Sequence, residues 1–196
     1  MPFPRRSAPS SLVTEAFVLR PIRAEDAEQD YAAVMESKEY LRRWEQTSWP
    51  EDDFTVAANR ADLIRLEQRH RDGVAYTYTV LDPTQATCLG CVYLLPHDAT
   101  FLTKATITPV AADDRWEEVD AAIYFWVRAS ALANQTDRVL LDTLRRWLAE
   151  DWDLDRYVFV TSEQFTQQVA LIESTDLQLR FHIREPDKPG RYLAYE

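Results

Sequence analysis

Two kinds of hydrophobic pattern alternate along the chain. Segments in which apolar and polar residues alternate, or in which β-branched and aromatic residues run together, are typical of strands, whereas apolar residues that recur every three or four positions are typical of helices. The pattern predicts strands at residues 16–22, 74–81, 88–95, 121–128 and 156–162, and a closing hairpin at 177–196. It predicts helices at residues 25–44, 54–71, 137–152 and 163–175, with a break in the first near Ser37.

The order of these elements is strand, two helices, three strands, helix, strand, helix and two strands. Mixed order of this kind indicates an α+β fold, in which helices pack on a largely antiparallel sheet. Residues 96–120 have little regular pattern, apart from a candidate short strand at 103–108, and a loop of that length is usually functional or disordered. No linker divides residues 16–196, so we expect one domain, preceded by a mobile Pro- and Ser-rich tail at residues 1–15.

The net charge of the chain disfavours two classes of binding partner. The formal net charge is −11, from 22 basic and 33 acidic residues, and no long basic run is present. This charge argues against binding to nucleic acid or to an anionic membrane surface. No apolar run approaches the roughly 18 residues of a membrane span, and no apolar signal segment follows Arg5 and Arg6, so we expect a cytoplasmic protein without an anchor.

The two cysteines, Cys88 and Cys91, lie three residues apart in an expected strand. Residues at that spacing point to opposite faces of a strand, so the sequence disfavours both a disulfide and a shared metal. We expect both thiols to be buried as small hydrophobic groups. The three histidines are scattered and form no metal-binding pair and no Ser-His-Asp arrangement; they are His70, His97 and His182.

Several segments resemble the GNAT N-acetyltransferase superfamily, and the resemblance extends from about Phe17 to the C-terminus. The segments are "LRPIRAEDA" (19–27), "WPEDDFTVAANRADLIRLEQ" (49–68), "CLGCVYLL" (88–95) and "AAIYFWVRASALANQTDRVLLDTLRRWL" (121–148). The resemblance implies a GNAT-like mixed, mainly antiparallel sheet that is flanked by helices, with strands splayed around a central cleft. It predicts that the strands at 121–128 and 156–162 run parallel and part at Val127.

The resemblance also implies acetyl-CoA or another acyl-CoA as co-substrate. The backbone near Val127 then holds the pantetheine arm, and a loop at the start of the following helix faces the diphosphate. The residues of this loop are Leu132, Ala133, Asn134, Gln135, Thr136 and Asp137.

The loop departs from the pattern of the family, which reads roughly Arg/Gln-x-x-Gly-x-Gly/Ala. The three defined positions fall on Leu132, Gln135 and Asp137. The Cβ of Gln135 hinders the approach of phosphate to the backbone. A carboxylate about 5 Å from a phosphate oxygen costs roughly 3 kcal/mol at an effective dielectric constant of about 20. The loop is therefore degenerate, and its polar residues Asn134, Thr136 and Asp137 suit caps of the helix instead.

Candidates for catalysis are few. A general base in this family tends to be a carboxylate on or before the fourth strand of the family fold, where this chain has Glu118 and Asp120. The alternative is that these residues belong to a solvated acidic loop. The tyrosine that the family often uses as an acid, in the helix after its fifth strand, is missing from residues 163–175.

Two functions therefore stay open at the level of sequence. The first is an acyl-CoA-dependent N-acetyltransferase that acts on a small amine or a peptide amine, and the acidic character of the chain favours cationic amines. The second is a non-catalytic binding or dimerisation module that kept the fold and lost the co-substrate, and a homodimer is one form that it could take.

Overall fold

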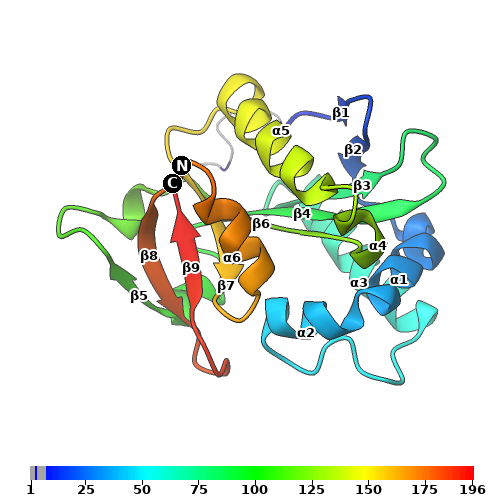
Figure 1. Ribbon diagram of the computed structural model, residues 1–196, viewed down its shortest axis with the longest axis horizontal. Helices are drawn as coiled ribbons and strands as arrows, with labels where there is room; N and C mark the ends of the chain where they lie inside the picture. Colours follow the sequence, from blue (N-terminus) through cyan, green and yellow to red (C-terminus); the bar gives the residue numbers. More distant parts are fainter. Residues whose placement is uncertain (1–2, 4–7) are drawn as a thin grey trace.

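The computed structural model describes residue 3 and residues 8–196. Its sheet contains nine strands (Figure 1). They are β1 (Leu12–Val13), β2 (Val18–Pro21), β3 (Tyr76–Leu81), β4 (Cys88–Pro96), β5 (Thr106–Pro109), β6 (Ala121–Val127), β7 (Tyr157–Ser162), β8 (Leu179–Arg184) and β9 (Tyr192–Tyr195). The helices are α1 (Ala27–Glu36), α2 (Lys38–Glu45), α3 (Val56–Arg71), α4 (Ala129–Leu132), α5 (Thr136–Asp151) and α6 (Thr166–Glu173).

The strand order is β1-β2-β3-β4-β6-β7-β9-β8-β5, and β6 and β7 form its parallel pair. All the other pairs of neighbouring strands are antiparallel. A parallel pair needs a crossover, and α4 and α5 supply it between β6 and β7. The expected α+β fold with a mainly antiparallel sheet is confirmed.

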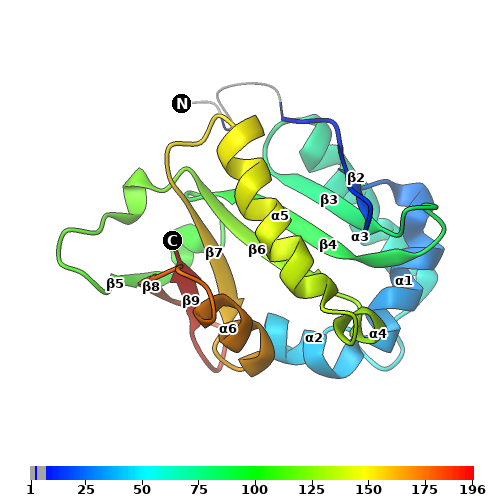
Figure 2. The same ribbon diagram turned by 45° about the horizontal axis from the view of Figure 1, so that its top comes forward.

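Helices cover both faces of the sheet (Figure 2). Helices α5 and α6 pack on one face through apolar residues such as Leu144 and Ile172. Helices α1, α2 and α3 pack on the other, through residues such as Val34, Trp44 and Leu63. None of the helices in the described residues is long and apolar enough to cross a bilayer.

The β6–β7 pair separates earlier than the sequence indicates. Pairing joins Ala121–Ile123 to Tyr157–Phe159 and stops there, so the strands part four residues before Val127. Beyond this point α6 inserts the buried side chain of Gln168, whose Nε2 donates to the Phe125 carbonyl oxygen at 2.9 Å. The parallel direction and the splay are confirmed, and the predicted position of the splay is wrong.

The remaining predicted elements compare with the structure as follows at the helix break, the irregular segment and the N-terminal strand. The first predicted helix breaks at Ser37, as expected, into α1 and α2. The irregular segment 96–120 contributes β5, which pairs with β8 at one edge of the sheet. At the other edge the two residues of β1 pair with Val18 and Leu19 of β2, so Pro21 lies beyond β1, where its missing N–H costs no ladder bond. Part of the predicted tail, residues 1–2 and 4–7, lies outside the described residues.

A bulge in β4 changes the placement of the cysteines. The register with β3 shifts between Val80 and Leu81, and Gly90 has φ 153°. One extra residue in a strand shifts the alternation of side chains by one, so the residues after it point to the opposite face of the sheet from the one that strict alternation predicts. Cys88 and Cys91 therefore share a face, where their Sγ atoms lie 3.8 and 3.5 Å from Asp30 Oδ1. The expectation of opposite faces is wrong, and both thiols are buried and free.

We predict that Gly90→Ala destabilises the fold strongly. A Cβ at Gly90 would lie 2.0 Å from the Trp126 carbonyl oxygen, and its φ is unfavourable for any L side chain. Overpacking of this kind costs roughly 3 kcal/mol of unfolding free energy, measurable by chemical denaturation. Gly73→Ala is the control, because its φ is also positive but the nearest atom, the Tyr76 hydroxyl oxygen, is 3.2 Å away; its loss should be about 1 kcal/mol. Equal losses for the two variants would contradict this reasoning.

Candidate active site

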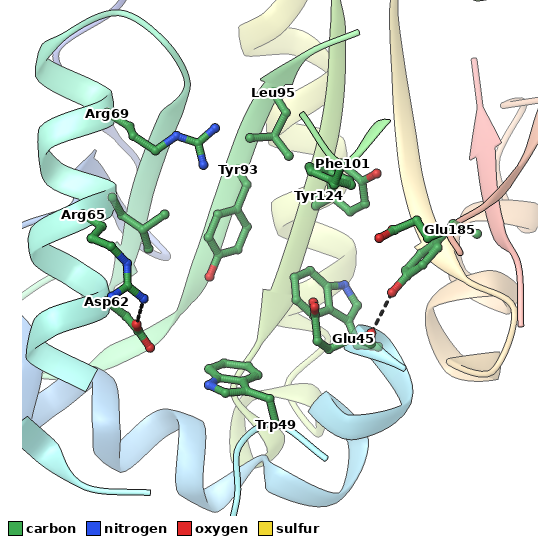
Figure 3. Close-up of a pocket in the computed structure, with 13 residues that line it drawn as sticks. Glu45, Trp49, Asp62, Arg65, Arg69, Tyr93, Leu95, Phe101, Tyr124 and Glu185 are labelled. Carbon is green, nitrogen blue, oxygen red and sulfur yellow. Dashed lines mark hydrogen bonds and ion pairs between the residues drawn. The ribbon is translucent and has the colours of Figure 1, made fainter. Parts of the chain in front are cut away.

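A cavity of about 620 Å³ lies on the side of the sheet that α1, α2 and α3 cover (Figure 3). This volume is in the range of small-molecule sites. Its lining is mainly apolar and aromatic, with charged groups at two sides. The lining residues are Trp44, Glu45, Trp49, Asp62, Arg65, Leu66, Arg69, Tyr93, Leu95, Phe101, Tyr124, Glu185 and Tyr192.

Adjacent strands supply the aromatic floor of the cavity. Tyr93 in β4 and Tyr124 in β6 are cross-strand partners, so both side chains leave the sheet on the same face. Trp44 from α2 packs against both, with ring centroids 6.0 and 6.5 Å away. The Tyr93 hydroxyl accepts a hydrogen bond from Trp126 Nε1 at 3.3 Å, which fixes its ring. The floor is therefore a preformed aromatic surface.

Helix α3 forms a wall with basic side chains. Asp62, Arg65, Leu66 and Arg69 follow the spacing i, i+3, i+4, i+7, which places them on one helical face. Arg65 forms an ion pair with Asp62. Among the residues that the structure describes, no ion pair involves Arg69, so its guanidinium is available to a ligand.

Two glutamates stand on the opposite wall. Glu45 ends α2 and Glu185 follows β8. Lys188 Nζ lies 2.7 Å from Glu45 Oε1, and the Tyr192 hydroxyl donates to the Glu45 carbonyl oxygen at 2.8 Å. Burial raises the pKa of the Glu185 carboxyl, and the positive charge of Lys188 partly opposes this shift. A carboxyl in a cavity whose pKa is raised by burial is a candidate proton acceptor.

Two polar atoms of the aromatic residues lack partners. Trp44 Nε1 and the Tyr124 hydroxyl are buried, and neither has a hydrogen-bond partner within the described part of the chain. Both side chains are 7% exposed and both line the cavity. Buried polar groups are usually hydrogen-bonded, but these two atoms have almost no accessible surface, so in this conformation the aromatic faces of the two residues, and not their polar atoms, are open to the cavity.

The predicted diphosphate loop is held by the side chains of the protein itself. Gln135 has φ 55°, the left-handed conformation for which the family uses glycine. Asp137 Oδ1 accepts from the N–H of Arg138 at 2.9 Å, and Asp137 Oδ2 accepts from Gln167 Nε2 at 2.8 Å. Asp137 thus links the start of α5 to α6. A diphosphate at this position would meet a carboxylate.

Polar groups just before this loop also form hydrogen bonds within the protein. Glu36 at the end of α1 accepts from Arg128 Nε at 2.6 Å and from the Ser130 N–H at 2.9 Å. The bonds from Arg128 and Ser130 lower the pKa of the Glu36 carboxyl to about 2. The Ala129 N–H donates to Ser37 Oγ at 3.0 Å. Of the other predicted loop residues, Leu132 ends α4, Ala133 and Asn134 form the turn, and Thr136 begins α5.

The splayed edge of β6 is better suited to the arm of acyl-CoA. Val127 is the last residue of β6, beyond the point where pairing with β7 ends. The Gln168 amide already bonds this edge at Phe125, as a pantetheine amide would, while Gln168 Oε1 has no partner among the described residues. An acyl-CoA arm at this edge would therefore have to displace Gln168 from the Phe125 carbonyl oxygen, and its diphosphate would meet Asp137.

The carboxylates proposed from sequence lie away from the cavity. Asp120 Oδ2 accepts from the N–H groups of Asp155 and Arg156 at 2.6 and 3.1 Å, an arrangement that fastens the start of β7. Glu118 is exposed, with Arg156 at 3.6 Å. Neither lines the cavity. Sequence reasoning missed Glu45 and Glu185, because only the folded chain brings α2 and the end of β8 together.

Comparisons with known proteins agree with this geometry. No family model and no curated protein match the chain. Among solved structures, it is similar to a putative ribosomal-protein-serine acetyltransferase from Vibrio cholerae, at 16% identity, TM-score 0.68, and 98% and 97% coverage of the two chains. It is also similar to a putative GnaT-family acetyltransferase from Bordetella pertussis, at 15% identity, TM-score 0.57, and 95% and 98% coverage. The chain has the GNAT fold. A third similar structure is the microcin C7 self-immunity acetyltransferase MccE with acetyl-CoA and AMP, at 12% identity, TM-score 0.67, and 96% coverage of both chains.

We predict weak binding of acetyl-CoA to the unaltered protein. Because Gln135 and Asp137 oppose the diphosphate, isothermal titration should show no binding tighter than about 1 mM, or about −4 kcal/mol. Gln135→Gly with Asp137→Gly removes one like charge and two Cβ atoms, and should tighten binding at least about tenfold. Asp142→Asn, on an exposed position of α5, is the control for a general loss of negative charge. Micromolar binding by the unaltered protein would overturn this view of the loop.

Proposed function

We propose that this GNAT-fold protein is an N-acyltransferase that transfers an acyl group from acyl-CoA to an amine bound in the cavity. One observation carries the proposal: Tyr124, on the cavity floor, belongs to β6 and directly precedes Phe125, at the edge that leaves its pairing with β7. In this proposal the amine lies on the cavity floor beside Tyr124, and the acyl arm reaches it along the adjacent open edge of the same stretch of β6. Adjacent placement of two reactants is a large part of catalysis of their transfer reaction.

Glu185 is the proposed proton acceptor. An amine enters the cavity as an ammonium ion, and it must lose a proton before its nitrogen can attack a carbonyl carbon. Burial raises the pKa of the Glu185 carboxyl, which makes it a stronger base than an exposed glutamate and suits it to accept that proton. Acyl-CoA, when bound, supplies the acyl group; the overall change joins this group to nitrogen and releases the CoA thiol and one proton.

The aromatic lining supports an amine as the acceptor. An ammonium ion over the face of a tryptophan or tyrosine gains about 0.5–2 kcal/mol, and Trp44, Trp49 and Tyr93 offer such faces. The similar Vibrio cholerae structure carries the name of a ribosomal-protein-serine acetyltransferase. A peptide amine is therefore a reasonable acceptor class for this chain.

A second candidate is a non-catalytic module that binds an amine in the same cavity. The link between Asp137 and Gln167 favours it, because this link crosses the route of a diphosphate. Incubation with acetyl-CoA and a panel of short peptides, followed by mass spectrometry, distinguishes the two functions. An acetylated product supports the acyltransferase. Peptide binding without product at saturating acetyl-CoA supports the module.

We predict that Glu185→Gln lowers kcat/KM by about 100-fold or more, the usual contribution of a general base. The activity of the unaltered enzyme should fall as pH decreases through a pKa above the usual glutamate range of about 4.3, because protonation removes the acceptor. The variant should lose this acid limb.

Glu118→Gln is the matched control for this experiment, because Glu118 is exposed and lies outside the cavity. It should leave both kcat/KM and the pH profile unchanged. A large loss of kcat/KM from Glu118→Gln, with little effect from Glu185→Gln, would contradict the assignment of Glu185 and favour the acidic residues before β6 as the base.

A further inference from the structure

The cavity has charges of opposite sign on its two sides. Arg65 and Arg69 of α3 approach it from one side, and Glu45 and Glu185 lie on the other, with Tyr93 between them (Figure 3). Simple apolar amines would use only the acidic side. The basic side offers two guanidinium groups, which bind carboxylates and phosphates through paired hydrogen bonds.

The strand order sets the separation of the two sides. Tyr93 on β4 adjoins the basic wall, and Tyr192 on β9 adjoins the acidic wall. β4 and β9 are three strand positions apart, in the order β4-β6-β7-β9. Three paired spacings of about 4.8 Å would give roughly 14 Å between backbones, and the parting of β6 from β7 after Ile123 and Phe159 widens this separation. A tripeptide, which spans about 10 Å when extended, therefore matches the separation better than a single α-amino acid does.

We propose that the cavity recognises an amine that carries an anionic group, carboxylate or phosphate, at its other end, with an aromatic or apolar body between them. The amino group is held at Glu45 and Glu185, and the anion at Arg65 and Arg69. This assignment deepens the proposed function, because it names the class of acceptor, but the binding itself does not depend on acyl transfer.

The test uses direct binding without acyl-CoA, so that a failure of acyl transfer does not affect it. The probe is alanyl-phenylalanyl-alanine, compared by isothermal titration with its C-terminal amide, its N-acetyl form and an analogue with a C-terminal phosphonate. The free peptide should bind at least about tenfold more tightly than either blocked form, the usual scale of a charge-assisted contact. Tighter binding of the phosphonate would identify phosphate as the natural anion, and equal or weaker binding would identify carboxylate.

Substitutions of the arginines test whether they bind the anionic end of the peptide. Arg65→Gln with Arg69→Gln should reduce the preference for the free carboxylate over the amide to within about twofold, since both hydrogen-bonding guanidinium groups are gone. Arg60→Gln, also exposed on α3 but outside the cavity lining, should retain the full preference. Equal affinity of the unaltered protein for free and amidated peptide would overturn the proposal. So would a preference that survives the loss of both arginines.

These binding data and the acetylation assay, taken together, separate the acceptor assignment from the acyltransferase proposal. If the free peptide binds with the predicted preference but is never acetylated, the acceptor assignment stands and the acyltransferase proposal fails. If the peptide is acetylated equally well with its carboxylate blocked, the acyltransferase proposal stands and the role of the arginines fails.

Discussion

The parting of β6 from β7 is the constraint on which the rest of the structure depends. A parallel pair requires a crossover, and here the crossover helix α5 covers the face opposite the cavity. Once the strands separate after Ile123 and Phe159, polar backbone groups of β6 lose their neighbours and need other partners. Gln168 satisfies the Phe125 carbonyl, so α6 is fixed against the open edge. The splay thus determines both the position of α6 and the boundary between the two halves of the sheet.

The start of α5 shows how stability and co-substrate binding oppose each other. A carboxylate in the first turn of a helix is stabilised by the helix dipole by about 0.3–1 kcal/mol, and Asp137 also bonds α6 through Gln167. The same charge opposes a diphosphate. The Glu36 carboxylate likewise accepts a hydrogen bond from Arg128, the residue that follows β6. The chain has therefore placed anions of its own where the GNAT fold can accept a bound anion.

The sequence predicts the elements better than the site. Periodicity identifies the strands and helices, because burial against one sheet imposes it, and even the break at Ser37 is visible. The bulge at Gly90 is not, since one inserted residue leaves no periodic signal, and it moves Cys88 and Cys91 to one face. The basic wall of α3 could have been found from the i, i+3, i+7 spacing of its charged residues. The acidic wall could not, because it joins segments about 140 residues apart.

The cavity and the loop differ in how many of their polar groups are open to a ligand. In the cavity, a carboxyl of raised pKa, Glu185, and the guanidinium of Arg69, which has no ion pair among the described residues, border a preformed aromatic floor. In the loop, the Asp137 carboxylate and Arg128 already have partners within the protein. The cavity is therefore open to a ligand, whereas the loop is closed by contacts within the protein. In the proposed acyl transfer both sites are needed, so the reaction would be limited by the loop, where an acyl-CoA would have to displace the contacts of Asp137.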